Sequence, residues 1–331
     1  MVAAAAAELV ASEGIPVRIA VRDLPSPVLS AAVTELGAAA TQNAGERALR
    51  PSAGQGRQDA DAEVGREERV RGGDLFMQMG GGKTQATELV KMAEMNEIED
   101  GKVNVVGPEI TEVKEGETFP LGIYVQVAGR EFQTDFEPIL ERQIHHLINY
   151  IQGIMHIGQR DIAWIRVSKA AIEKGFTLKD IGTVLHAKFH QDFQKIVDKV
   201  QVTLYSDKKD VDELTKRARA EYKARDERVE KMTDEDVETY YSCTLCQSFA
   251  PNHVCVVTPE RTGLCGAYNW LDCKASFNIN PTGPNQPIKL GKLIDNEVGY
   301  WEGTLDYAKV GSHGSVEEVS MYSIMENPMT A

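Results

Sequence analysis

The sequence predicts an α/β protein: a mixed-sheet middle domain over residues 74–235, followed over residues 236–331 by a partial α+β domain with a cysteine-rich loop. Between residues 102 and 232 the apolar pattern alternates between short β-branched runs and helical spacing, which is typical of an α/β domain. All five cysteines lie between residues 241 and 274. A chain of 331 residues, 42% of them hydrophobic, is long enough for about two domains with their own cores.

Residues 1–73 differ in composition from the rest of the chain. They contain no aromatic residue, and they contain eight arginines but no lysine. Alanine dominates, and a charged run closes the segment. Because a segment without aromatic side chains can bury little apolar surface, we expect weak structure here, above all from residue 42 onward.

The first strands are expected between residues 102 and 129, where KVNVVG and LGIYVQVAG are rich in β-branched residues. Before them, MGGGKT at 79–84 is similar to a phosphate-binding loop. That motif requires a glycine at position 77, which is Met77 in this chain. The sequence therefore predicts a turn between a strand and a helix at this point, and no nucleotide site.

Helices and strands then alternate up to the cysteine-rich region. Isoleucine and leucine recur at helical spacing after Phe136, and a long charged segment with paired Lys, Arg and Glu indicates a solvated helix. Thr233 and the three acidic residues after it form a capping box that starts a short helix. The expected elements are a helix over 136–158, a strand over 162–168, a helix over 178–200, a strand over 200–206 and a helix over 207–232.

Charge and hydropathy exclude two classes of partner. The net charge is −14 and the isoelectric point is about 5.1, whereas a general nucleic-acid-binding protein is basic. No run approaches 18 apolar residues, so we expect no membrane-spanning helix. Free cysteines at this density fit the reducing cytoplasm, which is the expected compartment.

Four cysteines follow the spacing Cys243-x2-Cys246-x8-Cys255-x9-Cys265. Single cysteines are commonly small core residues, but four within 23 positions after a C-x-x-C indicate a metal site. We therefore expect Cys243, Cys246, Cys255 and Cys265 to be metal ligands and Cys273 to be a small core residue. His253 lies between two of the four, but four thiolates already complete a tetrahedral or cubane ligand set.

The spacing of the four cysteines favours an iron–sulfur cluster and leaves zinc open. Structural zinc usually lies between two C-x-x-C knuckles or a C-x-x-C and a histidine pair. Here one knuckle is followed by two single cysteines on wider arms, which suit the separate iron corners of a cubane. Prolines and glycines in the loop allow tight turns whose backbone N–H groups can reach the sulfurs.

Three histidines of the predicted first helix are also candidates for metal ligands. His145 and His146 are adjacent, so they point to different faces of a helix and cannot form a helical metal pair. With His156, they are expected to be surface or hydrogen-bonded core histidines.

The sequences CQSFAPNHVC, TPERTGLCGAYNWLD and YSIMENPMT resemble the CO-methylating acetyl-CoA synthases of the carbon monoxide dehydrogenase/acetyl-CoA synthase complex. The resemblance runs from about Asp74 to Thr330, does not include residues 1–73, and is most specific in the cysteine stretch. It implies an acyltransferase of the Wood–Ljungdahl pathway that assembles acetyl-CoA from CO, a corrinoid-bound methyl group and coenzyme A. The implied partners are a carbon monoxide dehydrogenase subunit, a corrinoid iron–sulfur protein and coenzyme A.

The resemblance also implies roles for individual residues. Cys243, Cys246, Cys255 and Cys265 would hold the [4Fe–4S] cubane of a nickel–iron–sulfur A-cluster. Cys246 would bridge that cubane to nickel, and Phe249 would lie near the nickel site. The family places coenzyme A against an arginine-bearing middle domain, and guanidinium groups suit phosphate. The candidates for that contact are Arg130, Arg142, Arg160 and Arg166.

The sequence departs from the family pattern at its last residues. In the family, the segment matching Asn327–Ala331 continues into Ser-Cys-Gly-Cys, which seats the distal nickel. The expectation is therefore a truncated A-cluster domain that keeps the cubane ligands, lacks nickel and is inactive alone. Two alternatives are an iron–sulfur electron-transfer or structural fragment, and a zinc-stabilised interaction module.

Overall fold

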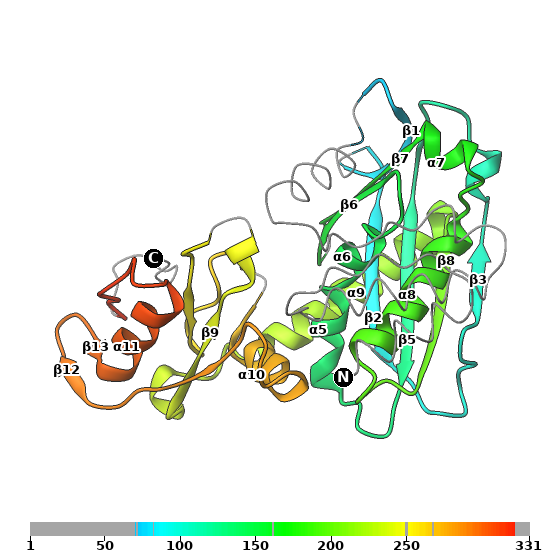
Figure 1. Ribbon diagram of the computed structural model, residues 1–331. Coiled ribbons are helices and arrows are strands. Elements are labelled where there is room, and N and C mark those ends of the chain that lie inside the picture. Colours follow the sequence, from blue (N-terminus) through cyan, green and yellow to red (C-terminus); the bar gives the residue numbers. More distant parts are fainter. Residues whose placement is uncertain are drawn as a thin grey trace, which may run out of the picture. The chain divides into compact units, whose positions relative to one another are not determined.

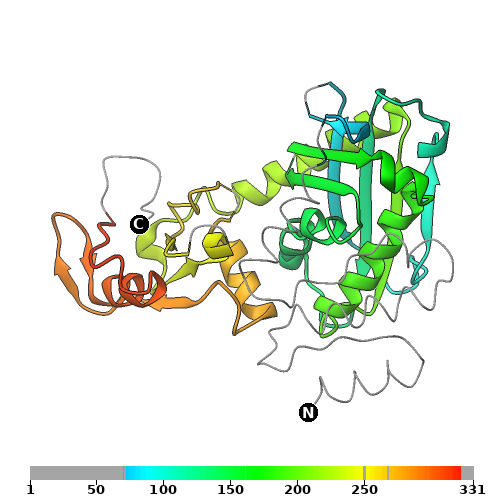
Figure 2. The ribbon, with the colours of Figure 1, turned by 45° about the horizontal axis from the view of Figure 1, so that its top comes forward.

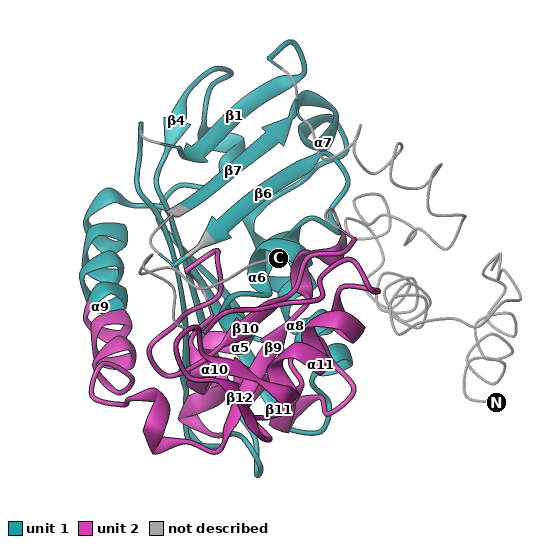
Figure 3. Ribbon diagram, turned by 90° about the vertical axis from the view of Figure 1, so that its left-hand side faces the viewer, with its two compact units in different colours: residues 1–132, 140–219 teal, residues 133–139, 220–331 magenta. Residues whose placement is uncertain are grey.

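The computed structural model describes residues 70, 72–81, 83–160, 162–248, 251–266 and 268–321. Nearly all of the segment 1–73, where weak structure is predicted, lies outside these residues. The chain forms two compact units (Figure 3). Unit 1 contains residues 1–132 and 140–219, and unit 2 contains residues 133–139 and 220–331. The domain boundaries predicted at residues 73 and 235 stay predictions.

Unit 1 is built on a mixed four-stranded sheet (Figure 1). Its strands pair in the order β2-β5-β8-β3, with β2 parallel to β5, β5 antiparallel to β8, and β8 parallel to β3. These strands are β2 (Ala86–Met92), β3 (Val103–Val106), β5 (Leu121–Ala128) and β8 (Lys199–Tyr205). The strands expected at KVNVVG, LGIYVQVAG and VQVTLYS are confirmed, and so is the mixed α/β class.

A second sheet of unit 1 has the order β4-β1-β7-β6. It consists of β1 (Leu75–Gly80), β4 (Thr118–Phe119), β6 (Ile154–Gln159) and β7 (Ile162–Ser168). Strands β1 and β4 pair in parallel, and the strands that come next in the chain after each of them, β2 and β5, also pair in parallel. The strand predicted over residues 162–168 is confirmed.

The MGGGKT segment connects two strands, so the expected strand-to-helix turn is wrong. Gly80 and Gly81 have φ of 75° and 71°, and a Cβ on Gly80 would lie 2.0 Å from the carbonyl oxygen of Ala163. The Thr84 hydroxyl accepts a hydrogen bond from the Gly80 amide and donates one to the Phe119 carbonyl, both at 2.9 Å. The glycines therefore serve close approach of neighbouring strands.

Two helices pack on opposite faces of the β2-β5-β8-β3 sheet (Figures 1 and 2). Helix α8 (Leu178–Asp192) packs on β8 and β3, and a Cβ on Gly182 would lie 2.4 Å from the Val103 side chain. The first turns of α9 (Lys208–Glu227) lie on the other face, where the Thr215 hydroxyl bonds that of Thr87. The predicted charged helix is confirmed, with shorter ends. Among the described residues of unit 1, the remaining helical turns are η1 (Ile110–Glu112), α6 (Ile144–Ile148) and α7 (Lys169–Glu173).

The helix predicted over residues 136–158 is wrong in its second half. The segment forms η2 (Thr134–Phe136), α5 (Glu137–Glu141) and α6, and then strand β6. Gly153 has a φ of 81°, where a side chain would meet the Ser168 hydroxyl, and from Ile154 onward burial alternates as in a strand. Isoleucines spaced three and four apart fit both patterns here, and strand pairing with β7 decides. The helix predicted over 178–200 likewise ends at Asp192, since residues 199–205 pair as β8.

Unit 2 contains a small antiparallel sheet with the order β10-β9-β11. Its strands are β9 (Thr239–Cys243), β10 (Cys255–Val257) and β11 (Pro287–Lys289). A core of Tyr240, Val256, Ile288, Ala308, Val319 and Met321 packs against it. From residue 228 onward, the other elements of the described residues are η3 (Asp234–Asp236), η4 (Leu245–Ser248), α10 (Trp270–Ile279), β12 (Leu293–Asp295), β13 (Tyr300–Trp301) and α11 (Glu302–Gly311).

The predicted capping box at Thr233 is confirmed. The Asp236 carboxylate accepts hydrogen bonds from the Thr233 amide at 2.7 Å and the Thr233 hydroxyl at 3.2 Å. Throughout the described part of the chain, no helix combines the length and apolar character that a bilayer crossing requires.

Candidate metal centre

The four cysteines of the predicted site gather at one end of the β9–β10 ladder. Cys243 ends β9 and Cys255 begins β10, and the two residues are direct partners in the antiparallel register. Cys246 lies one turn further on, in η4. Cys265 lies on the connection from β10 to α10. Residues up to 22 positions apart are thus brought to one place by a hairpin.

The ladder cysteines are buried, with exposed fractions of 7% for Cys243 and 4% for Cys255. Burial raises the pKa of Cys243 to about 12 and that of Cys255 to about 11. The pKa of Cys246 is also raised, by burial and by the nearby Cys265. Cys265 adds to the pKa rise at Cys243 and Cys255 as well, so the four sulfurs interact electrostatically. A raised pKa keeps the thiols of Cys243, Cys246 and Cys255 protonated, and a metal that binds them must displace their protons.

Several hydrogen-bond donors point at these sulfurs. Hydrogen bonds from the backbone of Leu245 and Leu264 oppose the pKa rise at Cys243 and Cys255, respectively. The His253 Nε2 lies 3.3 Å from the Cys255 sulfur. Donors of this kind stabilise a thiolate and tune a bound metal group. In the tautomer that is protonated at Nε2, His253 can therefore donate to the Cys255 sulfur.

The turn between Cys255 and Cys265 is tied to η3. The Asp234 carboxylate forms an ion pair with Arg261 and accepts a hydrogen bond from the Glu260 amide at 3.1 Å. In return, the Glu260 carboxylate accepts a hydrogen bond from the Asp234 amide at 3.1 Å. The side chains of the ion pair are 17% exposed (Arg261) and 9% exposed (Asp234). This clamp fixes the arm that presents Cys265.

Helix α10 supports the other side of β9. Asn269 and Asp272 form a buried capping box, with hydrogen bonds of 2.9 and 3.1 Å. The Trp270 Nε1 donates to the Thr239 carbonyl at 2.9 Å, and its ring meets Tyr241 edge-on. The cysteine strand is thus held by a packed helix.

Cys273 faces the interior of unit 2 from α10 and is fully buried. Its sulfur accepts a hydrogen bond from the Asn285 amide at 3.3 Å, and the same amide group donates to the Ser242 carbonyl. The prediction of a small core residue is confirmed.

The separation of the sulfurs bears on the choice between zinc and a cluster. A tetrahedral zinc–thiolate site with bonds of about 2.3 Å needs its sulfurs about 3.8 Å apart. In the described residues, no three cysteine sulfurs lie within 4.8 Å of one another. A cubane spreads its ligands over separate iron corners, and so suits the wider spacing better.

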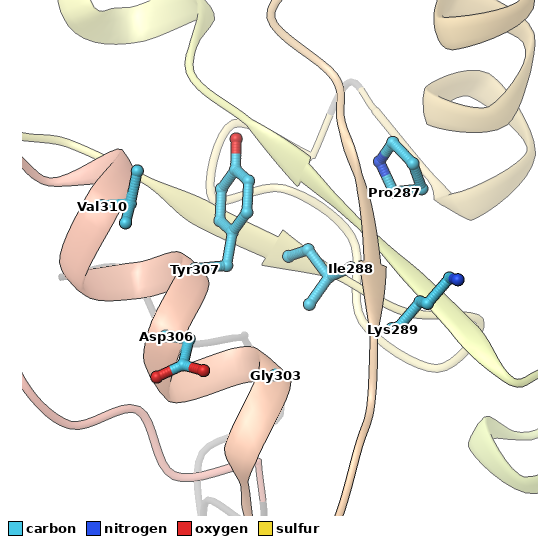
Figure 4. A pocket seen from close by; sticks show the side chains of 7 residues that line it. All are labelled: Pro287, Ile288, Lys289, Gly303, Asp306, Tyr307 and Val310. Carbon is cyan, nitrogen blue, oxygen red and sulfur yellow. The ribbon is translucent and has the colours of Figure 1, made fainter.

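Phe249, expected near nickel, lies outside the described residues. A groove in unit 2 lies between β11 and α11 (Figure 4) and has a volume of about 280 Å³. Ile288, Tyr307 and Val310 contribute apolar surface to it. No cysteine lines this groove, so it does not belong to the cysteine site.

In unit 1, the three histidines predicted to be surface or hydrogen-bonded core residues lie near one another. His156 is 1% exposed and contacts the buried Glu88 carboxylate, as expected of a paired core histidine. His145 stacks at 6.2 Å between ring centroids from His156 and at 3.8 Å from His146. Burial first, and then the charges of the two other histidines, lowers the pKa of His145 to about 3.

The four arginines considered for coenzyme A differ in their surroundings. Arg142 is 7% exposed, and Arg166 packs over the Trp164 ring at 4.2 Å and donates to the Val70 carbonyl. Arg130 is exposed and contacts Asp198. The contact of Arg130, Arg142, Arg160 and Arg166 with coenzyme A stays a prediction.

Sequence reasoning missed one further cluster in unit 1. His186 and His190 of α8 approach the Asp100 carboxylate at 3.0 and 2.8 Å. The signal was present in the sequence, since two histidines four residues apart on a helix share a face. Asp100, which is 86 residues earlier, could not be found from spacing.

The chain matches two family models. The first, described as CO dehydrogenase/acetyl-CoA synthase complex beta subunit, matches residues 62–211. The second, the C-terminal part of the same beta subunit, matches residues 222–331. The first match begins before Asp74 and includes the end of the segment 1–73.

Curated proteins with two different names are similar to this chain over 264 residues, which is 80% of its length. The carbon monoxide dehydrogenase/acetyl-CoA synthase subunit alpha of Moorella thermoacetica is 53% identical, and 36% of it is covered. The acetyl-CoA decarbonylase/synthase complex subunits beta of Methanopyrus kandleri and Methanothermobacter thermautotrophicus are 45% and 42% identical, with 56% and 57% covered. The chain thus spans between about a third and three fifths of these relatives.

Proposed function

Since the chain belongs to the family of carbon monoxide dehydrogenase/acetyl-CoA synthase beta subunits, we propose that its four cysteines hold the [4Fe–4S] part of an acetyl-CoA synthase centre. The proposed ligands are Cys243, Cys246, Cys255 and Cys265. The observation that supports this most is the convergence of the four thiols at the end of one hairpin. Thiolates are the ligands that iron–sulfur clusters use.

The residues around the sulfurs prepare them for this role. Burial of Cys243 and Cys255 keeps water from the ladder side of the site, while the backbone of Leu245 and Leu264 donates hydrogen bonds to their sulfurs. His253 supplies a further donor to Cys255. These donors stabilise sulfur charge that burial alone would disfavour.

In the complete protein we propose that this centre serves the assembly or cleavage of acetyl-CoA. When bound, the nickel–iron–sulfur centre of the family supplies the metal sites at which CO, a methyl group and coenzyme A combine. Cys246, which is less buried than the ladder cysteines, is the proposed bridge to nickel. The proposed partners are a carbon monoxide dehydrogenase subunit, a corrinoid iron–sulfur protein and coenzyme A, acting in the reducing cytoplasm.

The test is a set of single serine variants. Each of the four proposed ligands is changed in turn, and iron and acid-labile sulfide are measured per chain after anaerobic purification. We expect the four variants to lose most of both, while Cys273→Ser, the matched control, keeps them. Iron content that is independent of the four cysteines would refute the assignment. A colourless protein with one zinc would favour the zinc-stabilised interaction module instead.

A further inference from the structure

We propose that Asp100, His186 and His190 form a second metal site, which binds a divalent first-row transition ion in unit 1. The three residues share no ligand with the cysteines, and the inference does not depend on the proposed function. Among the described His, Cys, Asp and Glu residues, this is the one triple whose ligand atoms all lie within 4.8 Å of one another.

The helix brings the two imidazoles together. His186 and His190 are four residues apart on α8, so their side chains leave the same face one turn apart. Their ring centroids lie 4.6 Å apart. Both Nε2 atoms approach the same Oδ1 of Asp100, at 3.0 and 2.8 Å. The two nitrogens and this carboxylate oxygen therefore lie close enough together to share one ion.

The carboxylate is fixed before any ion binds. The Val200 amide, at the start of β8, donates to the same Asp100 Oδ1 at 2.9 Å. The Gly101 amide donates back to the Val200 carbonyl at 3.0 Å. Gly101 has a φ of 76°, which lets the chain turn sharply after Asp100. A ligand held by the backbone in this way loses little entropy when it binds a metal.

The distances suit a metal of this class. With metal–ligand bonds of about 2.0–2.2 Å, neighbouring ligands lie about 3.0 Å apart in an octahedral site and about 3.4 Å apart in a tetrahedral one. The observed separations of 2.8 and 3.0 Å fall close to this range. Two imidazoles and one carboxylate are donors that zinc and its first-row neighbours accept.

Solvent reaches the site from one side. The side chains of His186, His190 and Asp100 are 29%, 30% and 43% exposed. Three protein ligands leave at least one position for water or another small ligand. A bound ion would tie the turn at Asp100 to α8, which otherwise meet here through hydrogen bonds to a single oxygen.

Cobalt(II) is the probe, because it reports on its ligands. Thiolate-bound cobalt shows intense charge-transfer absorption, whereas cobalt on nitrogen and oxygen does not, so the cysteine site does not obscure the result. We expect about one thiolate-free cobalt per chain in addition to any cobalt on the cysteines, and zinc should displace it.

The variants are His186→Ala and Asp100→Asn, and the matched control is His313→Asn. His313 is exposed with a φ of 55°, a conformation that asparagine tolerates, and it lies in unit 2. Asp100→Asn keeps an oxygen that can accept from the Val200 amide, so it preserves the turn if His186→Ala does not fold.

We expect both site variants to weaken thiolate-free binding at least tenfold and the control to leave it unchanged. A folded Asp100→Asn protein that binds cobalt as the unmodified chain does would overturn the proposal. So would the absence of thiolate-free binding in the unmodified chain, which would leave Asp100 as a hydrogen-bond acceptor only.

Discussion

The clamp between η3 and the turn at residues 258–261 gives the sharpest prediction. In Asp234→Ala, the Arg261 guanidinium loses its carboxylate partner and the Glu260 amide loses its acceptor. Breaking a largely buried ion pair from one side leaves an uncompensated charge and costs about 3 kcal/mol. The matched control is Glu227→Ala in unit 2. It breaks an exposed ion pair with Lys223, and the expected loss of stability is well under 1 kcal/mol.

The assay is urea unfolding of unit 2, followed by the fluorescence of its tryptophans together with the time course of iron release to a chelator. With a slope of about 2 kcal/mol/M, the expected loss moves the midpoint by about 1.5 M. Because the clamp fixes the arm that presents Cys265, iron should also leave faster. Equal midpoints for Asp234→Ala and Glu227→Ala would refute the reasoning.

Two further predictions follow from single residues. Gly303→Ala should destabilise unit 2 by about 3 kcal/mol in chemical denaturation, because the new Cβ would lie 1.7 Å from the Lys289 carbonyl oxygen. The stability that the lowered pKa of His145 contributes is present above pH 6.5 and is lost as pH falls toward about 3. In His145→Gln, the free energy of unfolding should therefore fall less between pH 6.5 and pH 3 than in the unmodified chain. The expected difference is about 1–2 kcal/mol after allowance for partial exposure.

Elements whose structure depends on local sequence alone could be predicted from the sequence. LGIYVQVAG and IAWIRVS are too β-branched and too short for helices, and both form strands. The capping box at Thr233 depends on neighbouring residues alone, and it forms as expected. The charged helix needs no tertiary partner on its outer face, so its polar pattern was sufficient.

Where tertiary pairing decides, the sequence was ambiguous. The isoleucines around Ile154 satisfy helical and strand spacing alike, and only the partner strand β7 selects the strand. The glycines of MGGGKT serve the close approach of Ala163, which local sequence cannot reveal. Asp100 meets two histidines of α8 only because the Val200 amide of β8 holds its carboxylate beside them. Such contacts depend on the fold as a whole.

The central claim, that four cysteines hold an iron–sulfur cluster, is tested most directly by measuring iron, zinc and acid-labile sulfide in one anaerobically purified sample. The account predicts about four irons and four sulfides per chain, with little zinc. One zinc per chain without sulfide, or no metal at all, would contradict it.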